Sequence, residues 1–208
     1  MEMNPHDLIR IAKEEDLSTD LPLPAWVSGS LTLAPFVVVR RSNAPEGKIP
    51  VGVRGPERGQ RFPAWLRQEK AVAVITPHSL MGSANWNRVD NPGAPAAIQS
   101  LRRVTPLLQS TGYRWGPTGS VGFELAANTT TVKADSDLDI LIDLPEFVPI
   151  LSATRLMKDL QRRTLVRLDV QLNTPQGSLA LADYICAEKV LVKGNSGPQL
   201  LHRNSLWL

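Results

Sequence analysis

Hydrophobic and polar positions alternate most clearly in the second half of the chain. Residues 138–144 carry apolar side chains at every second position, and residues 166–172 alternate apolar residues with Arg167, Asp169 and Gln171. Successive side chains on a strand point to opposite faces, so both segments are predicted to be strands with one buried face.

Helical spacing marks other segments of the same half. Ile98, Leu101, Val104 and Leu108 recur at intervals of three or four residues, and Gly112 follows as a stop signal. These positions predict an amphipathic helix. Weaker patterns predict helices at 121–127, 151–164 and 178–187, strands at 113–115 and 189–193, and a turn at 116–120.

The first half contains short β-rich runs: LTLAPFVVVRR, IPVGVRG and AVAVITP, with a brief helix predicted near AWLRQE. The stretch NRVDNPGAP, rich in Pro, Gly and Asn, separates two halves of different pattern. We therefore predict an α+β protein with a small N-terminal α+β domain at residues 1–90. A second domain at residues 91–208 is predicted to carry a mixed sheet covered mainly on one face.

Composition is that of an ordinary globular protein, with 208 residues, 42% hydrophobic and 21% charged. The opening MEMNPHDLIRIAKEEDL has no apolar run of signal-peptide or transmembrane length, so a cytoplasmic location without membrane contact is expected. The single cysteine, Cys186, excludes an internal disulfide and is predicted to be a small core residue. Three histidines without metal spacing argue against a structural zinc site.

The net charge of +3 is too small to indicate a nucleic-acid partner, and none is expected. Its distribution is uneven, because residues 40–70 contain eight basic and three acidic residues. This basic segment is a candidate face for an anionic partner, and a solvated surface is an equal alternative.

Asp135, Asp137 and Asp139 occupy alternate positions and lead into the apolar run that begins at Ile140. On a strand, Asp137 and Asp139 share a face with Cα atoms roughly 7 Å apart. Carboxylates this close repel one another, and a divalent ion between them would relieve the repulsion. The pattern therefore favours a metal site.

The same acids have two alternative roles. Asp135, Asp137, Asp139 and Glu146 match positions 1, 3, 5 and 12 of an EF-hand calcium loop, but Ile140 stands where that loop needs glycine. The acids would otherwise be solvated residues at a strand edge that discourage aggregation.

Two further features favour the metal site over the strand-edge alternative. Gly119 and Ser120 form a turn just before a predicted helix, whose free N–H groups and positive dipole end suit phosphate oxygens. Asp169 lies between apolar neighbours on another predicted strand, and a third carboxylate there could complete the site.

This order of features resembles the nucleotidyltransferase superfamily of the polymerase-β type. The stretches WGPTGSVGFELA, SDLDILI, HDLIR, GVRGPERGQRF and VLVKGNSGPQLL together resemble the phosphoribosyl-dephospho-CoA transferases of the malonate decarboxylase system. The resemblance spans nearly the whole chain and implies a polymerase-β-like nucleotidyltransferase fold for the second domain.

The resemblance implies transfer of a prosthetic group from triphosphoribosyl-dephospho-CoA to a serine of the apo acyl carrier protein of malonate decarboxylase, with release of pyrophosphate. It also implies magnesium, usually two ions, held by Asp137, Asp139 and, by order and strand context, Asp169. These three acids are the expected catalytic residues, and Gly119 and Ser120 are expected to hold the triphosphate.

Four basic residues extend this expected site. Arg54, Arg58 and Arg61 would contact either the acidic carrier protein or the CoA phosphates, and Lys193 would be a further phosphate contact or a plain surface lysine. The alternative functions are another nucleotidyltransferase acting on a small molecule or protein, and a catalytically silent binding module.

Overall fold

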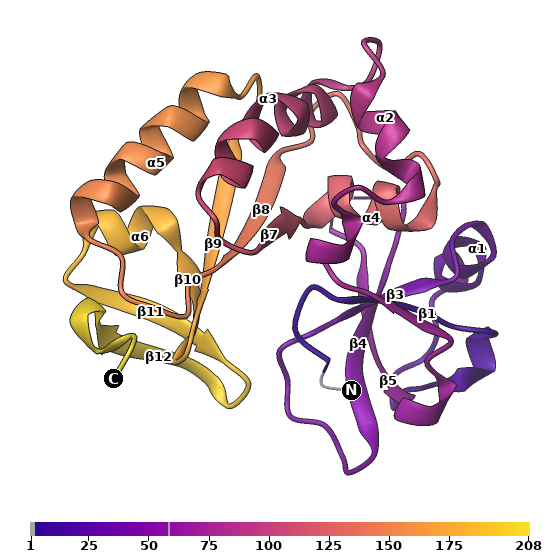
Figure 1. The fold of residues 1–208 in the computed structure, drawn as a ribbon. Coiled ribbons are helices and arrows are strands. Elements are labelled where there is room, and N and C mark those ends of the chain that lie inside the picture. Colours follow the sequence, from indigo (N-terminus) through magenta and orange to yellow (C-terminus); the bar gives the residue numbers. More distant parts are fainter. Residues whose placement is uncertain (1–2, 58) are drawn as a thin grey trace.

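The computed structural model describes residues 3–57 and 59–208. Its first half forms an antiparallel sheet with the strand order β2-β5-β4-β3-β1-β6 (Figure 1). The strands are β1 (Leu8–Arg10), β2 (Leu17–Ser18), β3 (Phe36–Val39), β4 (Lys48–Arg54), β5 (Arg61–Arg67) and β6 (Ala73–Ile75).

The second half forms a separate sheet with the order β12-β11-β10-β9-β8-β7. Its strands are β7 (Trp115–Pro117), β8 (Leu138–Asp143), β9 (Leu168–Thr174), β10 (Gly177–Ala180), β11 (Lys189–Gly194) and β12 (Gly197–His202). The β8–β9 pair is parallel and the other pairs are antiparallel. The predicted mixed sheet and the α+β class are therefore confirmed.

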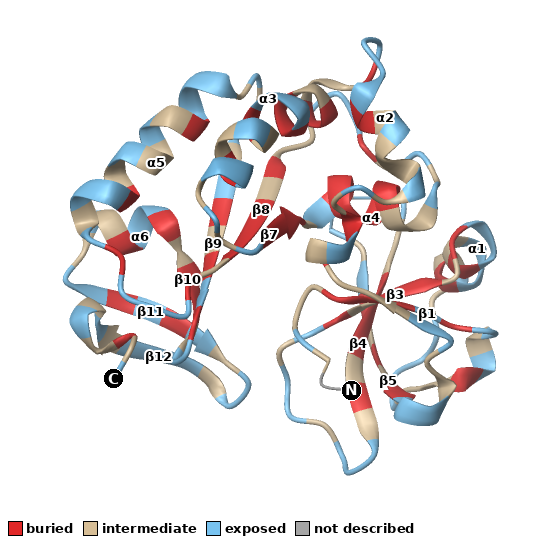
Figure 2. Cartoon of the chain, in the orientation of Figure 1, coloured by how far each residue is buried: buried red, intermediate tan, exposed pale blue. Residues whose placement is uncertain are grey.

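The helices are α1 (Ala25–Leu33), α2 (Asn87–Asp90), α3 (Ala96–Ser110), α4 (Gly119–Ala127), α5 (Ile150–Arg163) and α6 (Leu181–Cys186), with short 3-10 turns at Glu14–Asp16, Gln68–Lys70, His78–Leu80, Ala84–Trp86 and Arg203–Ser205. Apolar residues of α3, α4, α5 and α6 pack in one core with the Leu138, Ile140 and Ile142 side of β8. Figure 2 shows the buried positions along β8 and α4. The second sheet thus buries one face under helices, as its alternating pattern requires.

Helix α4 belongs to two cores at once. Val121 and Leu125 pack with the second sheet. Phe123, on another side of the helix, packs with Leu8 and Phe36 of the first sheet, and its ring meets that of Phe36 edge-on at 6.4 Å. Burying an aromatic side chain of this size stabilises by about 1.5–3 kcal/mol, so this contact joins the two halves.

Several sequence predictions were wrong in detail. Most of the segment near AWLRQE belongs to strand β5, whose buried Phe62, Ala64 and Leu66 alternate with less buried residues, and only Gln68–Lys70 forms a 3-10 helix. The segment 178–187 contains strand β10 before the short α6, because a turn ahead of Gly177 folds β10 back on β9. Cys186 is exposed, because it ends α6 on the side away from the core.

The predicted boundary after residue 90 stays a prediction. Leu80 and Val89, which precede it, pack in the core of the second sheet. In the described part of the chain, no helix combines the length and apolar character needed to cross a membrane. The cytoplasmic location also remains a prediction.

A polar contact joins the halves on the side of the second sheet that carries no helices. His6 Nε2 lies 3.0 Å from Nε2 of Gln171 on β9 and 3.4 Å from Nη1 of Arg41. Arg41 also donates through Nη2 to the Ser178 hydroxyl on β10 at 2.8 Å. Burial, and then the charge of Arg41, lowers the pKa of His6 to about 4.

Replacing His6 with Gln should reduce the acid sensitivity of the fold. Between pH 6.5 and 4 the unfolded chain binds a proton at His6 that the folded protein does not, so stability is lost as the pH falls through this window. Glutamine does not titrate. Urea unfolding at pH 7.5 and 4.5 should therefore show a loss in unfolding free energy that is smaller in His6→Gln by roughly 2–3 kcal/mol. Equal losses in both proteins would contradict this assignment.

Candidate active site

A cavity of about 760 Å³ is lined by residues of both halves. Asp137, Asp139 and Asp169 all line it, together with Gly119 and Ser120. Arg54, Arg61 and Arg167 contribute basic groups to the same wall. We call it the acidic cavity. The structure thus gathers most of the predicted site residues at one place.

Strand pairing brings Asp139 and Asp169 together. They are register partners in the parallel β8–β9 pair, so their side chains leave the same face of the sheet. Neighbouring strands are spaced about 4.8 Å apart. Leu138 and Ile140 occupy the opposite, buried face. Asp137 immediately precedes β8 and is half-buried.

Two alternatives for the acids are excluded by this arrangement. Asp139 and Ile140 are in extended backbone of β8, whereas a calcium loop must curl at these positions. Strand β8 is paired on both sides, with β7 and with β9, so Asp139 does not lie on a sheet edge.

Gly119 allows the start of α4 to reach the Asp139 carboxylate. Its φ of +59° is in the left-handed region, and a Cβ added there would overlap Oδ2 of Asp139 and lie 2.8 Å from its Cγ. The backbone N–H of Thr118 donates to the Asp139 carbonyl at 2.9 Å, which holds the two segments together. Only glycine satisfies both the conformation and the contact.

The first turn of α4 has the properties of an anion site. Gly119 and Ser120 open the helix, and Ser120 is buried. In the described structure the Thr118 side chain makes no capping hydrogen bond to this turn. The N–H groups of a first helical turn have no intrahelical carbonyl to bind, and the helix dipole is positive there.

Arg54 and Arg61 face one another directly across the β4–β5 pair. The pKa of Arg54 is lowered to about 10, first by burial and then by the charge of Arg61, while Asp139 acts in the opposite direction. Burial also lowers the pKa of Arg61, again opposed by Asp139. Like charges opposite each other on a strand pair destabilise it, so an anion bound between them would relieve repulsion. The predicted Arg58 lies outside the described residues.

The three carboxylates are hard oxygen donors of the kind that Mg²⁺ prefers. As the side chains stand, the described residues contain no group of three or more His, Cys, Asp or Glu close enough to hold an ion together. The donor chemistry, and the face that Asp139 and Asp169 share, fit magnesium, and both the ion and the expected number of two stay a proposal.

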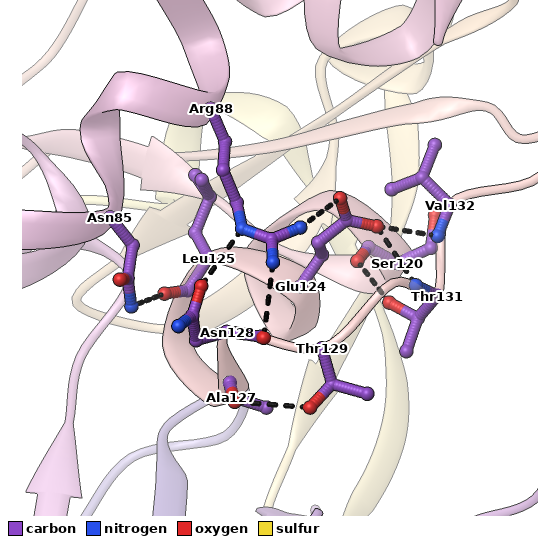
Figure 3. A network of polar contacts seen from close by, with 10 residues as sticks. All are labelled: Asn85, Arg88, Ser120, Glu124, Leu125, Ala127, Asn128, Thr129, Thr131 and Val132. Carbon is purple, nitrogen blue, oxygen red and sulfur yellow. Dashed lines mark hydrogen bonds and ion pairs between the residues drawn. The ribbon is translucent and has the colours of Figure 1, made fainter. Parts of the chain in front are cut away.

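A network around Glu124 fixes the loop that leads from α4 to the acids (Figure 3). Glu124 Oε2 accepts from the backbone N–H groups of Thr131 and Val132, both at 2.8 Å. Its Oε1 pairs with Arg88 Nη1 at 3.0 Å, and only 4% of the Glu124 side chain is exposed. Arg88 in turn donates to the carbonyl of Asn128, at the C-terminal end of α4. A buried charge thus holds the chain just before the acids without entering the site.

Lys193 lies apart from the other predicted site residues. It is exposed on β11 and, among the described residues, is not part of the wall of the acidic cavity. Its phosphate contact stays a prediction.

Sequence reasoning also missed cavity residues, namely Arg167, Lys133 and the threonines at 129–131. Position 167 sits two residues before Asp169 on the same side of the chain, which was an available signal.

Comparison with known proteins assigns the family. A family model described as phosphoribosyl-dephospho-CoA transferase MdcG C-terminal domain matches residues 79–204. The corresponding N-terminal domain model matches residues 4–77. The chain belongs to the phosphoribosyl-dephospho-CoA transferase family. Members of this family are transferases, so the protein is an enzyme.

Individual relatives agree with this assignment. A phosphoribosyl-dephospho-CoA transferase of Pseudomonas putida is 38% identical over 95% of this chain and 92% of its own. Those of Azotobacter vinelandii and Pseudomonas aeruginosa are each 35% identical, over 95% of this chain and 92% and 91% of their own length. No solved structure matches the chain.

Gly119→Ala tests the contact between α4 and Asp139. The substitution adds a left-handed alanine, which costs about 1–2 kcal/mol, and an overlap with a carboxylate. Gly47→Ala is the matched control, because Gly47 has a φ of +72° but open space around its missing Cβ. Urea unfolding should show a loss for Gly119→Ala that exceeds the loss for Gly47→Ala by about 1 kcal/mol or more. Equal losses would mean that the contact with Asp139 imposes no constraint.

Glu124→Gln tests the loop anchor. Both N–H groups bind the same carboxylate oxygen, so the glutamine carbonyl still accepts from them. Its NH₂ group then faces the Arg88 guanidinium, donor against donor, and the buried ion pair is lost, so unfolding free energy should fall by about 3 kcal/mol. Glu69→Gln is the control, because the Arg67–Glu69 pair has side-chain exposures of 58% and 63%. That change should stay below about 1 kcal/mol. A Glu124→Gln effect as small as the control would contradict the anchoring role.

Proposed function

We propose that the enzyme transfers the phosphoribosyl-dephospho-CoA part of 2'-(5-triphosphoribosyl)-3'-dephospho-CoA to a serine of the apo acyl carrier protein of malonate decarboxylase. Pyrophosphate is the second product. Family membership supports the identity of the transferred group. The single observation that carries the chemistry is the register pair Asp139–Asp169, which faces the glycine-started helix α4 in a cavity with paired arginines.

The proposed step is an in-line displacement at phosphorus. The serine oxygen forms a bond to the α-phosphorus of the donor, and the bond from that phosphorus to the oxygen bridging to the β-phosphate breaks. Pyrophosphate leaves with the bonding electron pair. The serine proton passes to a carboxylate, for which we assign Asp169, and from there to solvent. Asp169 suits this role because it lies beside Asp139 and is exposed to the cavity.

The residues around the acids neutralise the donor. The triphosphate would lie between the first turn of α4 and the pair Arg54–Arg61, where N–H groups and guanidinium groups meet its oxygens. Phosphoryl transfer asks a protein mainly for such positioning and charge neutralisation. We therefore assign the basic pair to the donor phosphates and not to the carrier protein.

Magnesium remains part of the proposal. Asp137, Asp139 and Asp169 would hold it, and when bound it would supply positive charge to the reacting phosphate and acidify the attacking hydroxyl. The chain's own contribution is to keep Asp139 and Asp169 on one face of the sheet, with Asp137 in the wall of the same cavity.

Mass spectrometry tests the function. The apo carrier protein is incubated with the enzyme, triphosphoribosyl-dephospho-CoA and Mg²⁺, and a serine-linked mass gain equal to the phosphoribosyl-dephospho-CoA group is expected. ATP in place of this donor should modify the carrier protein poorly. Efficient transfer of AMP from ATP, with no transfer from the larger donor, would identify a different nucleotidyltransferase.

Single substitutions test the acids. Asp139→Asn and Asp169→Asn should each lower the rate of carrier modification by about 100-fold or more, since each removes a charge that acts on the reacting groups. Asp137→Asn should also lower it. Asp159→Asn is the control, because Asp159 lies on α5 with a 44% exposed side chain that pairs with the neighbouring Arg162. Thermal unfolding should confirm that all four variants are folded. A near-normal rate for Asp139→Asn would refute the assignment.

A further inference from the structure

A second cavity of about 500 Å³ adjoins the acidic cavity. The two share Arg54, Arg61, Gly119 and Phe123 in their walls. We propose that this arginine cavity binds the dephospho-CoA half of the donor, its adenosine and diphosphate, while the acidic cavity binds the triphosphate. The inference rests on the proposed function and adds a second, separate recognition site to it.

The walls suit a nucleoside. Leu8 and Val38 of the first sheet form one side, and Phe123 of α4 brings an aromatic ring to the cavity. The guanidinium carbon of Arg54 lies 5.9 Å from the centre of the Phe123 ring, a cation–π geometry that fixes both groups. Flat apolar surfaces with few polar groups are what an adenine ring requires.

The charges suit a diphosphate. Arg40, Arg41, Arg54 and Arg61 line the cavity, and among its described lining residues there is no Asp or Glu. Arg41 is partly engaged by Ser178, whereas Arg40 is an exposed residue at the rim. A purely apolar ligand would leave several arginines desolvated without a counter-charge, which is unfavourable. The cavity therefore fits an anion that also carries an apolar ring.

The connection between the cavities suits this donor in particular. It carries phosphate groups at two places, a triphosphate on one ribose and a diphosphate on the CoA arm. The shared residues Gly119, Arg54 and Arg61 stand at the junction of the two cavities, so a triphosphate held by them lies next to the cavity that takes the rest of the donor. ATP has one phosphate chain and would occupy one cavity only. The arginine cavity is therefore the source of selectivity against ATP.

Isothermal titration calorimetry tests whether the two cavities bind different parts of the donor. It uses two separate probes, dephospho-CoA and inorganic tripolyphosphate. Both should bind the wild-type protein, and saturating tripolyphosphate should change the Kd of dephospho-CoA by less than about fivefold. Val38→Phe fills the arginine cavity from β3 and should raise the Kd of dephospho-CoA about tenfold or more, with tripolyphosphate changed by less than about twofold. Arg40→Ala is the second variant and should also raise the Kd of dephospho-CoA. The exposed Arg40 side chain can be removed without disturbing the core.

Arg167→Ala is the reciprocal variant, because Arg167 lines only the acidic cavity of the two. It should weaken tripolyphosphate and spare dephospho-CoA. Direct competition between the two probes, or an unchanged Kd of dephospho-CoA in both Val38→Phe and Arg40→Ala, would overturn the inference.

The two proposals can fail separately. If the carrier protein is modified but Val38→Phe and Arg40→Ala leave the KM for the donor unchanged, the arginine cavity is not a donor site and the function stands. If dephospho-CoA binds as expected but no serine-linked mass gain is seen, the recognition site stands and the proposed transfer reaction falls.

Discussion

The close approach of Gly119 to the Asp139 carboxylate is the contact on which the site depends. It places the positive end of a helix beside an acid on an interior strand of the second sheet. The acid cannot withdraw, because its backbone is paired with β9 and its carbonyl accepts from Thr118. The helix cannot withdraw either, because its two sides are buried in different cores. Rigid elements on both sides therefore hold the geometry that phosphate chemistry requires.

Charge in the cavity is balanced between the halves. The second sheet contributes the acids, and the first contributes Arg54 and Arg61 on adjacent strands. The acids repel one another, and so do the two arginines. Asp139 opposes the lowering of the pKa values of Arg54 and Arg61. Folding thus concentrates unfavourable like charges in one place, where an anionic substrate and its counter-ions stabilise them. Such a concentration is typical of a functional site.

Local patterns in the sequence were sufficient for the elements whose burial follows a simple period. Alternation along residues 138–144 and 166–172 identified β8 and β9, and the strand geometry put Asp139 on the face opposite Ile140. The same alternation was present in RFPAWLR and was misread, because Ala, Trp, Leu and Arg also suit a helix.

Pairing between distant segments was decided only by the tertiary structure. The register that sets Asp139 beside Asp169, the opposition of Arg54 and Arg61, and the meeting of Gly119 with Asp139 each depend on contacts between segments. A one-residue slip in any pair would turn those side chains to other faces, and no local pattern specifies the register. The sequence by itself determined which residues could do the chemistry, and the packing of α4 between two sheets determined that they meet.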